Sequence, residues 1–188
     1  MNLVTHFLIG WLVANSAGLE RKERALVTIA GIIPDIDALG AVAEIITKNW
    51  KKPLLWYSKY HHAISHNLGF ALLVVVLCFL LSKQRWKTSL LAFLNFHLHL
   101  LGDLIGARGP DGYQWPMPYL LPFSDKWQLT WSGQWELNAW PNFLITFTAL
   151  FITFYLAWKR SYSPLEMVYK SVDKAFVETL RNRFPGKK

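Results

Sequence analysis

The sequence predicts an all-α protein: an antiparallel bundle of about five apolar helices, with an aromatic-rich loop and a C-terminal amphipathic helix. Apolar residues make up 53% of the 188 residues, and charged residues only 17%, against roughly 25% in an average soluble domain. The single cysteine, Cys78, excludes an intrachain disulfide framework and a cysteine metal cluster. We expect one membrane-associated helical domain over residues 1–160, followed by a basic amphipathic helix over 161–188.

The apolar residues gather in five stretches, which cover residues 3–19, 25–46, 67–81, 89–107 and 141–158. None is an uninterrupted run of about twenty apolar residues, the length that crosses a bilayer core. Polar residues interrupt several stretches, and polar groups inside a membrane helix are costly enough to mark functional sites. We therefore expect a multi-pass membrane protein, with a small soluble all-α bundle as the alternative.

The basic residues indicate an orientation in the membrane. The formal net charge is +8, and 14 of the 20 Lys and Arg residues follow the first, third and fifth apolar stretches. In an antiparallel bundle these links share one side, which the positive-inside rule assigns to the cytoplasm, together with the C-terminal tail. Lys48, Lys51, Lys52 and Lys59 would lie on the opposite side and weaken this assignment.

The segment between residues 106 and 140 is rich in aromatic residues and prolines, so a long regular helix is not expected in its first half. Its five tryptophans would anchor the chain at a membrane interface or shape an entrance for a lipid-like substrate. Aromatic and basic residues together can bind single-stranded nucleic acid. Here they would lie on opposite sides, so we expect membrane lipid rather than nucleic acid as a partner.

The C-terminal segment has the pattern of a separate helix. Ser163-Pro164-Leu165-Glu166 has the form of a capping box with proline at the first helical position. One apolar stripe then follows at helical spacing, formed by Leu165, Val168, Val172, Phe176 and Leu180. This pattern fits a basic amphipathic helix on the cytoplasmic surface, and it fits equally a helix that packs on the bundle.

Histidine and aspartate residues from four separate segments would meet at the end of the bundle that lies away from the basic links. These residues are His6, Asp35, Asp37, His61, His62, His66, His99 and Asp103. Buried charges need partners, so apolar segments that carry such groups indicate a shared site. His97 lies two residues from His99 and would point elsewhere on a helix, as a packed or hydrogen-bonded histidine.

The spacing of these residues favours metal ligation. His99 and Asp103 are four residues apart and share a helix face, as would His62 and His66 if a helix has begun by His62. Asp35 and Asp37 would share a face in extended chain. A mixed His/Asp set without cysteine suits Zn²⁺ first, with Mn²⁺ or Fe as alternatives, in one or two ions.

Four short motifs, in their order along the chain, resemble the membrane-bound metal-dependent hydrolase family, also described as LexA-binding, inner-membrane-associated hydrolases. They are Thr5-His6, Pro34-Asp35-Ile36-Asp37, His61-x-x-x-Ser65-His66 and His99-x-x-x-Asp103, and the resemblance covers residues 1–125. In the third motif that family usually has His-Arg followed by Thr-His. In this chain His62 stands in place of the arginine and Ser65 in place of the threonine. The resemblance therefore carries over His61 and His66, whereas helical spacing favours His62, and both stay open.

A more distant likeness is to the zinc-dependent phospholipase C and nuclease group, which would imply phosphodiester hydrolysis. This chain lacks that group's second His-x-x-x-Asp/Glu element, so a three-metal site is not expected.

Together with the converging residues, these resemblances imply a metal-dependent hydrolase in a bacterial inner (cell) membrane, acting on an ester or phosphodiester in a small or lipid-like substrate. The expected metal ligands are His6, Asp35, Asp37, His61, His66, His99 and Asp103. Asp37 would bridge two ions or take the proton from water, and Arg108 would stabilise an anionic oxygen or be a surface arginine. The alternative is a non-enzymatic membrane protein with a structural, sensing or transport metal site. The oligomeric state is not predicted.

Overall fold

The computed structural model describes residues 1–186, and within them the chain is helical, with two isolated β-bridges and no strand. Lys187 and Lys188 of the predicted basic tail lie outside the described residues. The elements are α1 (Leu3–Ala14), α2 (Arg21–Ala30), the 3₁₀ helix η1 (Ile33–Leu39), α3 (Gly40–Thr47), α4 (Trp56–Tyr60), α5 (Leu68–Leu81), α6 (Arg85–Gly106), α7 (Trp140–Arg160), the 3₁₀ helix η2 (Pro164–Met167) and α8 (Lys170–Arg183).

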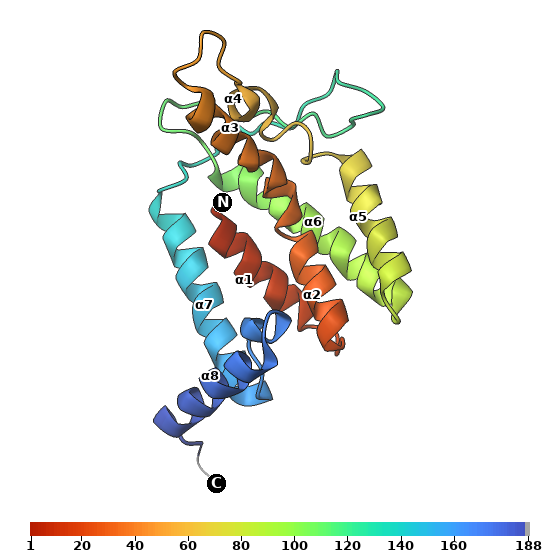
Figure 1. Cartoon of the computed structure of the whole chain (residues 1–188), viewed down its shortest axis with the longest axis vertical. Helices are drawn as coiled ribbons and strands as arrows, with labels where there is room; N and C mark the ends of the chain where they lie inside the picture. The colour runs from red at the N-terminus through yellow and green to blue at the C-terminus, as the bar shows by residue number, and fades with distance from the viewer. Residues whose placement is uncertain (187–188) are drawn as a thin grey trace.

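The predicted all-α bundle is confirmed. Helix α1 packs against α2, α6 and α7, while α6 also packs against α2 and α5. Figure 1 shows α2, α5 and α7 running roughly with the long axis and α1 and α6 crossing it obliquely, with α3 and α4 beyond the N-terminal end of α1 and the links after α1 and α5 toward the opposite end. The buried core includes Trp11 of α1 and Phe96 of α6. The site end and the basic end are therefore opposite ends of one bundle.

Two helices are long and apolar enough to cross a membrane, namely α6 and α7. A third span is added if α2 and the segment Ile33–Thr47, bent by 53° at their junction, count as one broken helix. Helices α1 and α5 are apolar but shorter. Large apolar side chains of α7, such as Phe147 and Phe151, are exposed, as expected for a surface that faces lipid.

The second apolar stretch breaks after Ala30, where the backbone passes through Gly31 into η1 and Pro34 occupies an early helical position. The prediction that Asp35 and Asp37 share a face in extended chain is wrong, because both lie in a 3₁₀ helix. With three residues per turn, positions two apart point in different directions. The two carboxylates consequently approach His66 at different ring nitrogens, Asp35 at Nε2 and Asp37 at Nδ1.

Asparagine caps fix the starts of two helices that carry the site. Asn2 Oδ1 accepts a hydrogen bond from Thr5 N at 2.9 Å, which places His6 in the first turn of α1. Asn67 Oδ1 accepts from Phe70 N at 2.9 Å and starts α5 directly after His66. A side-chain oxygen at this position satisfies a backbone N–H that the helix leaves unpaired.

The C-terminal helix begins later than the capping box predicts. Ser163 caps only the 3₁₀ turn η2, with its Oγ 3.2 Å from Leu165 N, and α8 starts at Lys170. Glu166 does not complete a capping box, because its carboxylate pairs with Arg24 of α2 at 2.6 and 2.7 Å. A tertiary ion pair has thus replaced the local cap.

Only part of the predicted apolar stripe packs against the bundle. Phe176 lies against Phe154 of α7, with 5.7 Å between the ring centroids, whereas Val168 and Val172 are exposed. The helix therefore packs on the bundle along part of its apolar face. The division of the chain at residue 160 stays a prediction.

Candidate metal centre

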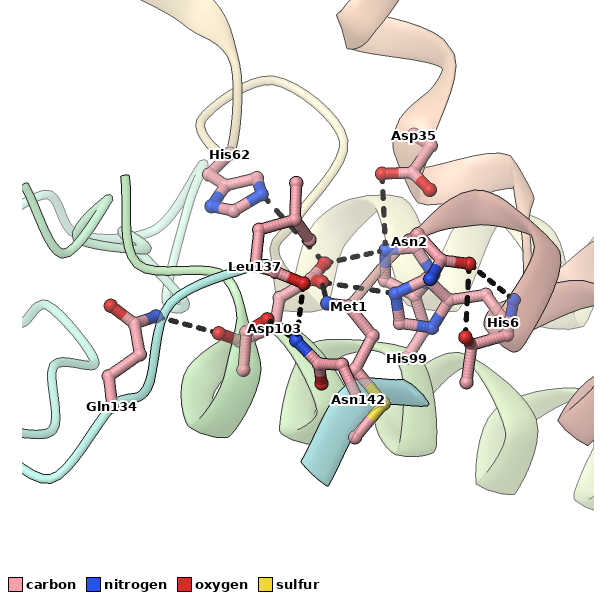
Figure 2. A network of polar contacts seen from close by, with 12 residues as sticks. Met1, Asn2, His6, Asp35, His62, His99, Asp103, Gln134, Leu137 and Asn142 are labelled. Carbon is pink, nitrogen blue, oxygen red and sulfur yellow. Dashed lines mark hydrogen bonds and ion pairs between the residues drawn. The ribbon is translucent and has the colours of Figure 1, made fainter. Parts of the chain in front are cut away.

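Four side chains from three elements converge at the end of the bundle that carries the N-terminus. Asp35 comes from η1, His66 from the turn before α5, and His99 and Asp103 from successive turns of α6. Each offers one ligand atom, and these four atoms all lie within 4.8 Å of one another. Figure 2 shows Asp35 reaching toward His99 and Asp103 from a separate helix.

The spacing of the ligand atoms fits a single ion. His66 Nε2 and His99 Nε2 are 3.2 Å apart, and Asp103 Oδ2 lies 3.0 Å from His99 Nε2 and 3.5 Å from His66 Nε2. Asp35 Oδ1 is 3.7 Å from His99 Nε2 and 4.0 Å from His66 Nε2. Bonds of 2.0–2.1 Å to a tetrahedral Zn²⁺ place neighbouring ligand atoms about 3.3 Å apart.

The imidazoles of His66 and His99 are each oriented by a hydrogen bond at Nδ1, the ring nitrogen that does not face the other histidine. His66 Nδ1 lies 3.1 Å from Asp37 Oδ2, and His99 Nδ1 lies 2.9 Å from Gly31 O. Both partners only accept, so each Nδ1 carries the proton and each neutral ring presents an unprotonated Nε2 to the other. Either an extra proton or a cation must lie between the two nitrogens. Carboxylates and carbonyls play this orienting role for metal-bound histidines.

The two oxygens of the Asp103 carboxylate have different surroundings. Its Oδ1 lies 3.0 Å from His6 Nε2 and forms an ion pair with the amino group of Met1. Its Oδ2 is buried and has no aligned hydrogen-bond donor among residues 1–186. A buried acceptor without a donor is costly, and a metal ion would satisfy it. The residues present therefore fit a bound divalent metal ion, although the donors alone do not fix its identity.

Two histidines in the loop between α4 and α5, His62 and His66, have pKa values shifted in opposite directions. Burial alone lowers the pKa of the His66 imidazole, but the nearby carboxylates of Asp103 and Asp37 raise that pKa to about 9. Burial dominates at His62 and holds its pKa well below the ordinary value, despite the nearby carboxylate of Asp103. Without a metal, His66 thus carries the extra proton between the two facing rings.

His61 and His62 occupy different places around this group. His61 Nδ1 lies 2.8 Å from Asp37 Oδ1, so this histidine pairs with the carboxylate that also orients His66. The helix assumed for His62 and His66 does not exist, because α5 begins only at Leu68 and His62 has a φ of 64°. The ring of His62 still comes within 3.8 Å of Asp103 Oδ2 (Figure 2), and its Nδ1 is buried without a partner among the described residues.

Two other residues considered from sequence lie outside the group. His97 is hydrogen-bonded through Nδ1 to Phe93 O and through Nε2 to Tyr119 Oη, both at 2.8 Å, as expected for a packed histidine. Arg108 pairs with Glu136 at 3.7 Å, and within residues 1–186 it has no polar contact with the four converging side chains.

The contacts of several supporting residues were not predicted from the sequence. Gln134 of the aromatic loop donates from Nε2 to Asp103 O at 2.7 Å and is buried. Ser65 Oγ donates to Pro34 O at 2.5 Å and joins the histidine loop to η1. The edge of Trp115 meets the rings of His61 and His62. No periodicity marks a single glutamine in a loop, so only the fold reveals these contacts.

The fold and this centre define a class: a helical protein with two or three apolar helices long enough to cross a membrane and a buried His/Asp group that could hold a metal ion. Residues 1–171 match the model of the YdjM inner membrane protein family. The chain belongs to that family. No curated protein and no solved structure matches it.

Proposed function

We propose that this inner-membrane protein is a metal-dependent hydrolase of an ester or phosphodiester in a lipid-like substrate. The observation that supports the proposal is the convergence of two imidazole nitrogens and two carboxylate oxygens around one point, with Asp103 Oδ2 unsatisfied there. Three of the four residues are buried, while Asp35 is partly exposed. A small molecule could therefore approach on the Asp35 side.

Asp35, His66, His99 and Asp103 would hold the ion, and His6 would support Asp103 through its second oxygen. The donor set favours Zn²⁺, with Mn²⁺ or Fe as alternatives. A bound ion of this kind supplies Lewis-acid polarisation of the substrate oxygen and lowers the pKa of water. The resemblance of the motifs to metal-dependent hydrolases supports the same chemistry.

Asp37 and His61 form a second functional pair beside these ligands. Both carboxylate oxygens of Asp37 are engaged by imidazoles, Oδ1 by His61 and Oδ2 by His66. This arrangement favours Asp37 as an orienting group over a direct general base. His61, whose Nδ1 is held by Asp37, would accept a proton from water at Nε2, as an imidazole oriented by a carboxylate does.

The proposed orientation places this centre on the outer side of the inner membrane. The basic links lie at the opposite end of the bundle, and the positive-inside rule assigns them to the cytoplasm. The substrate would then be a lipid or small ester that reaches the outer leaflet.

A direct test is hydrolysis by the purified protein in detergent with phosphomonoester, phosphodiester and phospholipid substrates, before and after chelation. We expect turnover of one class that chelation abolishes and that added metal restores. Asp103→Asn should lose both bound metal and turnover, whereas His97→Gln should keep both. A protein that holds metal and turns over no substrate of these classes would refute the proposal.

A structural metal site is the second candidate, because the four side chains alone could complete a tetrahedral set, as closed structural zinc sites do. In that case chelation would lower the unfolding temperature sharply, and no substrate would be hydrolysed. The catalytic proposal instead expects activity to be lost at chelator concentrations that leave the helical content unchanged.

A further inference from the structure

An apolar groove lies beside the candidate metal centre, between η1 and α3 on one side and α4 with the following loop on the other. It encloses about 680 Å³, within the range of pockets that bind small molecules. The lining includes Ile36, Leu39, Val42, Ile46, Trp56 and Ile64. Its acidic member is Asp37, the carboxylate that orients His61 and His66. The groove therefore leads from the surface to the edge of the centre.

The side chains along this groove are unusually exposed for their type. Leu39 and Ile46 are 65% and 66% exposed, and Trp56 is 51% exposed. Exposed apolar patches of this kind mark sites where an apolar partner binds. Helices α3 and α4 approach closely at Gly40, where a Cβ would meet Tyr57 N at 2.7 Å. Glycine at this position therefore lets the two walls approach each other at one end of the groove.

Four lysines flank this groove in the sequence, and they are the same cations that weaken the positive-inside assignment. Lys48, Lys51 and Lys52 follow α3 directly, and Lys59 lies between the groove residues Trp56 and Tyr60 on α4. All four are exposed, and within residues 1–186 none of them forms an ion pair. The carboxylate of Glu44, in the same region, is occupied by Ser58 N and Oγ. The segments that flank the groove thus carry four exposed cations against the single carboxylate of Glu44.

We propose that the groove holds an acyl chain of an anionic phospholipid, with the four lysines after α3 and on α4 binding its headgroup. An apolar channel flanked by cations complements an amphiphile that carries a phosphate. Helix α3 has eight residues and is about 12 Å long, which is short for seating a partner helix of several turns. The proposal names the substrate class of the hydrolase and rests on that proposed function.

The test is photolabelling of the full chain in phosphatidylcholine nanodiscs that contain a trace of phosphatidylglycerol with a photoactivatable acyl chain. Mass spectrometry of the peptides should locate the label in residues 36–46 and 56–64. Ile46→Asp should reduce this labelling about tenfold, the effect expected for loss of one buried aliphatic contact. The matched control is Ile45→Asp, since Ile45 has the same 66% exposure on the same helix but does not line the groove.

A second pair of variants tests the headgroup. Replacing Lys48, Lys51, Lys52 and Lys59 by glutamine should remove the preference for phosphatidylglycerol over phosphatidylcholine, whereas the same replacement of Lys83, Lys87, Lys126 and Lys174 should keep it. Equal labelling of the Ile46→Asp and Ile45→Asp proteins, or equal labelling by both lipids in the natural protein, would overturn the proposal.

Labelling should persist in Asp103→Asn, which makes the two proposals separable. Groove labelling without hydrolysis of any substrate would refute the hydrolase and leave the lipid groove standing. Hydrolysis of a soluble ester without groove labelling would refute the lipid groove and leave the hydrolase standing.

Discussion

Asp37 illustrates how one side chain links the metal centre to its surroundings. It accepts from His66 Nδ1 on one oxygen and from His61 Nδ1 on the other, while it also lines the apolar groove. A carboxylate in this position fixes the tautomer of the ligand and raises its basicity. Its contribution should therefore appear in metal affinity.

We expect Asp37→Asn to weaken metal binding by about 10–100-fold, the usual effect of losing a carboxylate behind a histidine ligand. Competition with a calibrated metal indicator measures this loss. At saturating metal the variant should still bind the ion, because the ligand atoms themselves are intact. Asp111→Asn, at an exposed turn, is the control and should match the unaltered protein. An unchanged affinity in Asp37→Asn would show that this carboxylate does not act through His66.

The protonation of His66 predicts a pH dependence of metal binding. Its carboxylate neighbours raise the pKa of the metal-free imidazole to about 9, so His66 is protonated at neutral pH and must lose a proton when metal binds. Apparent affinity should therefore fall as pH falls, by up to about tenfold per pH unit for one displaced proton. Indicator competition at several pH values between about 6 and 8 tests this. A flat profile would mean that the metal displaces no proton.

The residue types and positions of the centre could largely be predicted from sequence, but their partners could not. The four-residue spacing of His99 and Asp103 fixes their common helix face, and the helix forms as expected. The partners of His61 and His62 depend on a loop with a positive φ at His62, which no periodicity encodes. Asp35 and Asp37 diverge because the proline bend folds into a 3₁₀ helix rather than an extended chain.

At the scale of elements, competition between local and tertiary contacts explains where the predictions fail. Glu166 has the sequence context of a helix cap, yet a nearly buried ion pair with Arg24 takes its carboxylate. The two side chains are only 6% and 12% exposed. A pair in such a position is costly to break from one side, because the remaining charge stays desolvated. This pair joins η2, and with it α8, to α2.

Glu166→Gln should therefore loosen the C-terminal segment. We expect a loss of about 3–5 kcal/mol at this contact, enough to expose residues 161–186 to limited proteolysis in detergent. The matched control is Glu178→Gln, which breaks the exposed i,i+4 pair with Lys174, worth about 0.3–0.5 kcal/mol. Identical cleavage rates in the two variants would show that the ion pair with Arg24 does not hold the tail.

At the scale of the whole molecule, the His/Asp group and most of the Lys and Arg residues lie at opposite ends of the bundle. Imidazoles and carboxylates meet at the end that holds the N-terminus, and the links with most of the basic residues lie toward the other (Figure 1). The five apolar stretches could be found from hydropathy, and short links between helices favour antiparallel neighbours. A break in the second stretch could be predicted from Pro34, but the angle of 53° could not, since it depends on how Gly31 and η1 pack.

The proposed orientation can be measured with single cysteines in a Cys78→Ala background. Lys126→Cys probes the aromatic loop and Lys174→Cys probes α8, and both positions are exposed. If the basic links face the cytoplasm, a membrane-impermeant maleimide should label Lys126→Cys in intact spheroplasts and Lys174→Cys only after lysis. The Cys78→Ala protein alone is the control for background labelling. The reverse pattern would invert the orientation and move the proposed lipid groove to the inner leaflet. Labelling of both positions before lysis would mean that α7 does not cross the membrane.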